Sequence, residues 1–147
     1  MRAVTVQRFV PAPAAAIFDV LADPAMHPVI DGSGTVRASL EGSPDRLALG
    51  ARFGMAMRIL GPYRITNEVV EFEEGRRIAW SHIGGARWRY ELEPVDEGTL
   101  VRETFDFSTT TVPLLPVFFR LARFPQRNRA GMAATLERLA DLVTVAS

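Results

Sequence analysis

The stretch SHIGGARWRYELEP, residues 81–94, predicts a strand, a glycine turn and a second strand. Side chains alternate between the two faces of a strand, so Trp88 and Tyr90 share one face of the second strand and charged residues occupy the other. On the first strand, Trp80 and His82 share a face in the same way. Aromatic residues on both strands therefore favour one common buried face.

The length of the glycine turn decides which of these residues pair across the hairpin. A two-residue loop would expose Trp80, whereas a three-residue loop, residues 84–86, pairs His82 with Trp88 and Trp80 with Tyr90. Burial of a large apolar side chain contributes about 1.5–3 kcal/mol, which outweighs the preference for the shorter turn. We therefore expect the three-residue loop, with all four side chains facing inward.

Alternating apolar residues and turn signals extend this hairpin in both directions along the chain. Short turns between consecutive strands are typical of an antiparallel meander. Inward-facing residues can be assigned on two more strands, with Phe53, Met55 and Met57 on one and Glu103 and Phe105 on the last. The predicted strands are residues 4–10, 35–40, 52–60, 63–72, 77–83, 87–95 and 100–108.

Helical patterns flank the strands. Two short helices are expected within residues 11–24 and 24–32, because Pro13 suits a first helical turn and apolar residues follow at helical spacing. From Gln126 onward an apolar stripe predicts a long amphipathic helix, and Pro125 should kink or break its join to a shorter helical segment upstream. The stripe consists of Met132, Leu136, Leu139 and Val143.

These elements predict one α+β domain over residues 1–147, in which a curved antiparallel sheet of about seven strands wraps the long C-terminal helix. The 17 basic residues balance the 17 acidic ones, which argues against a nucleic acid as partner. The absence of cysteine excludes disulfides and thiolate chemistry. The longest apolar stretch, residues 112–119, is shorter than the roughly 20 residues of a membrane span, so we expect no stable membrane insertion. The strand-like N-terminus is unlike a signal peptide and favours a cytoplasmic protein.

Four segments resemble the START-like, helix-grip proteins of the polyketide cyclase and lipid-transport superfamily (SRPBCC). They are the opening pattern VxRxVxAPAxxIFDVLADP, ITNEVVEFEEGRRIAW at residues 65–80, RWRYELEPVDEGTLVRETFDFS at 87–108, and TLERLADLV at 135–143. The resemblance covers nearly the whole chain. It implies a sheet that grips the C-terminal helix, with a deep apolar cavity between them.

The resemblance also implies which residues face that cavity. Alignment with the polyketide aromatase/cyclases places Ile65, Asn67 and Val69 in the pocket, and Trp88 at the position of a pocket tryptophan. Asn67 stands where such cyclases have a serine, while Val69 and His82 stand where they have arginines. Without these arginines the anchoring of a poly-β-ketone chain is lost, which favours binding over cyclisation.

Three functions follow from this interpretation. The first is binding of a hydrophobic or aromatic small molecule, lipid- or polyketide-like, in the cavity. The second is a cyclase or dehydratase in which His82 and Glu103 transfer protons and Asn67 orients a carbonyl. The third is a protein-interaction domain with no ligand. The predicted ligand-binding residues are Phe53, Met55, Met57, Ile65, Asn67, Val69, Trp80, His82, Trp88, Tyr90, Glu103, Phe105 and Phe118.

Other polar residues have alternative interpretations. His27 and Asp31 would lie at the cavity entrance, or Asp31 would serve as an ordinary turn residue. The two histidines lack the spacing of metal ligands, so we expect no metal ion and no cofactor. Arg120, Arg123 and Arg127 would contact an acyl-carrier protein or a lipid surface, or would form a solvated helix face.

Overall fold

The computed structural model describes residues 3–58, 61–81, 85–110 and 124–145, of which 124–127 and 145 are described by backbone alone. Within them, the chain forms one strand, three short helical segments (the second running directly into the third), six strands and a long helix, in the predicted order. The strands are β1 Ala3–Val10, β2 Val36–Ser39, β3 Arg52–Arg58, β4 Pro62–Glu73, β5 Arg77–Ser81, β6 Arg87–Val95 and β7 Gly98–Asp106. The helices are α1 Ala14–Leu21, η1 Pro24–Met26, α2 His27–Ile30 and α4 Phe124–Val145.

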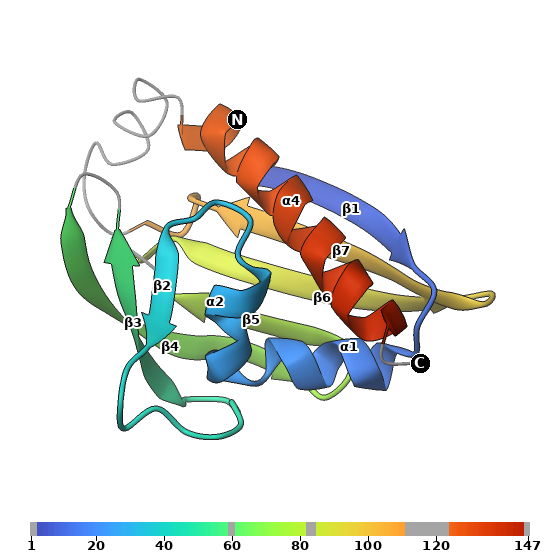
Figure 1. Cartoon of the computed structure of the whole chain (residues 1–147), viewed down its shortest axis with the longest axis horizontal. Coiled ribbons are helices and arrows are strands. Elements are labelled where there is room, and N and C mark those ends of the chain that lie inside the picture. The colour runs from blue at the N-terminus through green and yellow to red at the C-terminus, as the bar shows by residue number, and fades with distance from the viewer. Residues whose placement is uncertain (1–2, 59–60, 82–84, 111–123, 146–147) are drawn as a thin grey trace.

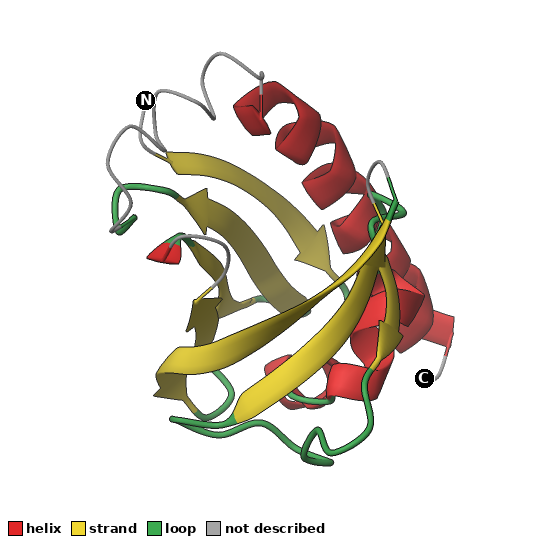
Figure 2. Ribbon diagram, turned by 90° about the vertical axis from the view of Figure 1, so that its left-hand side faces the viewer, coloured by secondary structure: helices red, strands yellow, loops and turns green. Residues whose placement is uncertain are grey.

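The strands form one antiparallel sheet in the order β1-β7-β6-β5-β4-β3-β2. The sheet is strongly curled, and α4 lies across its open side (Figure 2). The helix runs beside β1 and over β7, while α1 contacts β6 and α2 lies beside β2 (Figure 1). This arrangement confirms the predicted helix-grip fold, in which the helices shield the concave face from water.

Helix α4 presents the predicted apolar stripe to the sheet. Met132, Leu136, Leu139 and Val143 are all buried, as the spacing from one helical turn to the next requires. The helix begins at Phe124, so Pro125 occupies its first turn, where a missing N–H removes no intrahelical hydrogen bond. The predicted kink concerns the join to residues 111–123, which lie outside the described residues.

The β5–β6 hairpin differs from its predicted register. Trp80 pairs with Trp88, not with Tyr90, and the last pair of the hairpin is Ser81 with Arg87. The connection therefore spans residues 82–86 instead of three residues. A shift of two positions leaves every side chain on the face it already had, so the pattern of apolar residues cannot distinguish the two registers. The inward direction of Trp80, Trp88 and Tyr90 was correctly predicted.

Strand β4 contains a β-bulge that reverses its inward face. Asn67 and Val69 are buried on the concave side, as predicted, but the register shifts between Val69 and Glu71. The extra residue turns Glu71 outward, where its carboxylate binds the guanidinium group of Arg89 at 2.7 Å. Beyond the bulge, Phe72 points inward and packs edge-on against Phe18 of α1, with ring centroids 5.5 Å apart. The odd-numbered residues predicted to face the pocket, Ile65, Asn67 and Val69, all precede the bulge, and beyond it the inward residue is the even-numbered Phe72.

Candidate functional site

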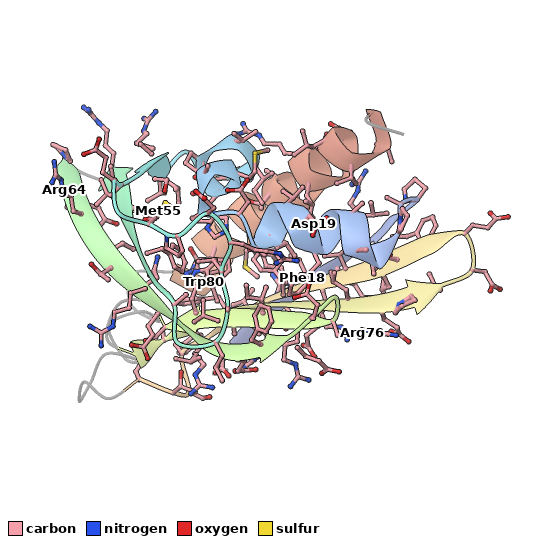
Figure 3. The ribbon with its side chains drawn as sticks, turned by 90° about the horizontal axis from the view of Figure 1, so that it is seen from below. Phe18, Asp19, Met55, Arg64, Arg76 and Trp80 are labelled. Carbon is pink, nitrogen blue, oxygen red and sulfur yellow. The ribbon has the colours of Figure 1, made fainter. Side chains whose placement is uncertain are left out.

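A cavity of about 170 Å³ lies between the concave face of the sheet and helices α2 and α4. Figure 3 shows Met55 and Trp80 on the side of the sheet that faces the helices, whereas Arg64 and Arg76 point away from it. Aromatic and aliphatic side chains form most of the wall. The described lining residues are His27, Ile30, Asp31, Ser33, Thr35, Val36, Met55, Met57, Tyr63, Ile65, Asn67, Trp80, Trp88, Tyr90, Glu103, Phe105, Asn128, Gly131, Met132 and Thr135.

The structure brings nine of the 13 predicted ligand-binding residues together in this wall. Phe53 and Val69 are buried in the adjoining core without lining the cavity. His82 and Phe118 lie outside the described residues. The residues found in the wall are Met55, Met57, Ile65, Asn67, Trp80, Trp88, Tyr90, Glu103 and Phe105.

Stacked rings form one side of the cavity. The indole of Trp80 lies nearly parallel to the imidazole of His27, with ring centroids 4.7 Å apart and an interplanar angle of 22°. The ring of Phe53 packs edge-on against the rings of both His27 and Trp80. On the neighbouring strands, the ring centroids of Trp88 and Phe105 are 4.8 Å apart. Stacked, tilted and edge-on contacts of this kind favour particular ring orientations along this wall.

His27 has a structural hydrogen bond within the wall. Its Nε2–H donates to the backbone carbonyl of Leu21 at 2.8 Å. Burial lowers the pKa of the imidazole, and this outweighs the opposing effects of the Leu21 carbonyl and the Asp23 charge. A neutral imidazole stacked on Trp80 therefore connects the end of α1 to the sheet. The sequence placed His27 at the entrance, whereas it packs against the inner wall.

Glu103 is the buried acid of the cavity. It lies directly opposite Tyr90 on the neighbouring strand, and the Tyr90 hydroxyl interacts with its carboxyl group. Burial raises the pKa of the Glu103 carboxyl well above its usual range, and the charge of Asp31 raises it further against the opposing effect of Tyr90. Burial likewise raises the pKa of Tyr90. Atom Oε1 of Glu103 has no hydrogen-bond partner among the described residues.

Asp31 fulfils the turn role that the sequence suggested and also lines the cavity. Its carboxylate accepts hydrogen bonds from the hydroxyl of Ser33 at 2.8 Å and from the backbone N–H of Val36 at 2.9 Å. The backbone N–H of Ser33 also donates to Asp31 Oδ1 at 3.2 Å, which makes an Asx turn in the loop between α2 and β2. Asp31 is therefore a structural residue whose negative charge remains close to the cavity.

The loop between α2 and β2 is attached to α4 at the rim of the cavity. The backbone N–H of Gly32 donates to the hydroxyl of Thr135 at 2.8 Å, and Arg138 donates to the backbone carbonyl of Asp31 at 2.6 Å. Ser33 belongs to the cavity wall and is exposed, so the cavity reaches the surface here. The sequence analysis missed this rim, because it depends on a close approach of segments about 100 residues apart.

The remaining predicted contacts lie elsewhere. Arg120 and Arg123 are outside the described residues, as is the side chain of Arg127, so the carrier-protein or lipid-surface contact stays a prediction. Within the described part of the chain, no three His, Asp or Glu side chains come together as a possible metal site. In the same residues, no helix combines the length and apolar character that a membrane crossing requires.

A curled antiparallel sheet that grips a C-terminal helix around an apolar cavity defines the START-like, helix-grip class of proteins. The chain belongs to the polyketide cyclase/dehydrase and lipid transport family, whose model matches residues 1–144. It is 40% identical over 135 residues to the uncharacterized protein Rv0088 of Mycobacterium tuberculosis. That match covers 90% of this chain and 60% of the relative, so the chain spans about three fifths of the relative's length.

Solved structures share the fold at low sequence identity. Protein NE0264 from Nitrosomonas europaea is similar with a TM-score of 0.72 and 15% identity, over 97% of this chain and 94% of the other. The AHSA1-like protein from Aeromonas hydrophila has a TM-score of 0.67 and 19% identity, over 98% and 93% of the two chains. At this level of identity the similarity concerns the arrangement of the backbone alone.

Proposed function

We propose that this protein binds a hydrophobic or aromatic small molecule, lipid- or polyketide-like, in the cavity between the sheet and helix α4. The observation that carries the proposal is a cavity of about 170 Å³ whose wall is mostly aromatic and aliphatic. Asn67, Tyr90 and Glu103 supply a few polar groups. Small-molecule sites combine apolar walls with sparse polar anchors in this way.

The volume supports a small ligand. An engineered apolar cavity of about 150 Å³ is known to take up benzene, so the present cavity accommodates about one aromatic ring with a short substituent. Larger ligands need sites of about 300–1,000 Å³. A longer lipid or polycyclic molecule would therefore have to displace part of the wall, and the α2–β2 loop lies at the exposed rim.

The other two predicted functions have less support. A domain that only contacts partner proteins would be expected to fill its interior, and the cavity between Trp80, Trp88 and helix α4 argues against that. The cyclase or dehydratase interpretation pairs Glu103 with His82, which lies outside the described residues. The described partner of Glu103 is Tyr90. Binding is thus the function that the described wall supports best.

Tryptophan fluorescence provides a direct test. The chain has two tryptophans, Trp80 and Trp88, and both line the cavity. Titration with ethylbenzene, naphthalene and a short fatty alcohol should give saturable quenching, and native mass spectrometry should show one ligand per chain. Absence of both signals for every probe would contradict the proposal.

A matched pair of variants locates the binding site. Ile65→Phe adds bulk to the cavity wall, whereas Thr66→Phe adds the same side chain to the opposite, exposed face of β4. We expect Ile65→Phe to weaken ethylbenzene binding about tenfold or more, equivalent to about 1.4 kcal/mol. Thr66→Phe should bind like the wild type. Equal affinities for the two variants would place the ligand elsewhere.

A further inference from the structure

The carboxyl group of Glu103 is the one buried polar group of the described cavity wall with an atom lacking a partner. Glu103 has only 2% of its surface exposed, and its Oε1 has no hydrogen bond within the described residues. The polar group that influences its carboxyl most directly is the Tyr90 hydroxyl, from the adjacent strand. A buried acceptor without a partner is unfavourable, so a ligand group that bonds to Oε1 gains binding free energy.

The charges around the cavity restrict what that group can be. Two acidic residues, Glu103 and Asp31, belong to the described wall, and no lysine or arginine does. His27 provides no positive charge, because burial keeps its imidazole neutral and its Nε2–H is bonded to Leu21. An anionic ligand would therefore approach carboxyl groups with no compensating cation in the described wall.

The same surroundings keep the Glu103 carboxyl in its neutral form. Burial among Tyr90, Phe105 and the other apolar groups of the wall disfavours its charge, as does the nearby Asp31. A neutral carboxyl group both donates and accepts hydrogen bonds. It can therefore accept from a hydroxyl group of a ligand or donate to a carbonyl oxygen, and neither bond requires a charged ligand.

We propose that the ligand presents an uncharged hydroxyl or carbonyl oxygen to Oε1 of Glu103, and that the cavity rejects the carboxylate analogue of the same molecule. This inference rests on the proposed binding function and specifies the chemical class of the ligand. Glu103 sets the specificity, while the aromatic wall provides affinity that is independent of the polar group.

The test uses probes that share one ring and a short side chain: ethylbenzene, phenethyl alcohol, acetophenone, phenethylammonium and phenylacetate. At neutral pH we expect the alcohol or the ketone to bind about tenfold or more tighter than phenylacetate, because the anion is desolvated beside Asp31 with no cation in the described wall to compensate its charge. Tightest binding by phenylacetate or by phenethylammonium would overturn the inference.

Two variants connect the preference to Glu103. Glu103→Gln retains a neutral side chain that donates and accepts, so the affinity for phenethyl alcohol should stay within about threefold of the wild type. Glu103→Met retains the length but loses the hydrogen bond, so the affinity for the alcohol relative to ethylbenzene should fall about three- to tenfold. An unchanged ratio in Glu103→Met would overturn the inference. Failure of ethylbenzene itself to bind the wild type would instead contradict the proposed function.

Discussion

Replacing Gly32 by alanine would place a methyl group inside the contact between the α2–β2 loop and helix α4. A Cβ atom at residue 32 would lie 2.5 Å from the backbone nitrogen of Thr135 and 2.6 Å from the carbonyl carbon of Ala134, whereas ordinary contact begins at 3.4 Å. These neighbours include helix backbone, which cannot rotate away as a flexible side chain can. The loop must therefore move by about 1 Å.

That movement has a calculable effect on stability. It would stretch the hydrogen bond from Gly32 to Thr135, now 2.8 Å, beyond hydrogen-bonding distance, with a loss of about 0.5–1.5 kcal/mol. Overpacking of a tight contact adds about 1–3 kcal/mol. We expect Gly32→Ala to lower the free energy of unfolding by about 2–4 kcal/mol. For a chain of this size, that corresponds to a fall in Tm of about 4–15 °C.

Calorimetry or thermal melting followed by circular dichroism would measure this effect, with Gly61→Ala as the control. An added Cβ at Gly61 meets no atom within 4 Å, so that variant should melt within about 1 °C of the wild type. Thr135→Val should be clearly destabilising in the wild type and nearly neutral in Gly32→Ala, where the bond is already broken. A Gly32→Ala protein that melts like Gly61→Ala would refute the close-packing argument.

Three further predictions concern charge and packing. Hydrogen bonds from Arg89 and from Arg87 lower the pKa of Glu71 to about 2, although partial burial opposes this shift. The charged Glu71 side chain therefore stabilises the fold above about pH 4.5, and this stabilisation is lost as the pH falls toward 2. In urea titrations, Glu71→Gln should therefore lower the free energy of unfolding by roughly 1–3 kcal/mol at pH 7 and by much less at pH 3. As a control, Glu68→Gln, which removes an exposed ion pair with Arg52, should change the free energy of unfolding by less than about 1 kcal/mol. The pKa of Glu103 is raised, so Glu103 has the opposite effect on the pH dependence of stability. The free energy of unfolding falls as the pH rises above about 4.3, because the carboxyl group ionises in the unfolded chain and stays neutral in the folded one. Glu103→Gln should be more stable than the wild type at pH 8 and similar to it at pH 4, and identical pH profiles would contradict a neutral carboxyl. Phe18→Ala should cost about 3–5 kcal/mol because the ring is fully buried against Phe72, whereas Val29→Ala, at a residue that is 54% exposed, should stay within about 0.5 kcal/mol in the same melting assay.

The alternation of apolar residues predicted the faces of most strands. It was sufficient on β3 and β7, where Phe53, Met55, Met57 and Phe105 are buried as expected. The buried stripe of α4 followed from helical spacing in the same way. These predictions succeeded because a strand or helix that packs against a core has one buried face and one solvent-exposed face. The apolar and polar residues must alternate accordingly within the segment itself.

Two features could not be predicted from such patterns. The pairing of Trp80 with Trp88 differs from the predicted pairing by two positions, and such a shift changes neither face. The bulge before Glu71 cannot be predicted from β4 alone, because a residue counts as extra only when β4 is paired with β5. The attachment of Gly32 to Thr135 has no local signal either, since it depends on how a distant helix lies over the loop.

The bulge in β4 divides one strand between two separate tasks. Before it, Ile65 and Asn67 line the cavity; after it, Phe72 packs against Phe18 of α1. Substitutions in the first half can alter the shape of the cavity while the packing around Phe18 keeps the chain folded. Evolution or design could thus vary the cavity wall on a constant scaffold, which fits a fold maintained at 15–19% identity.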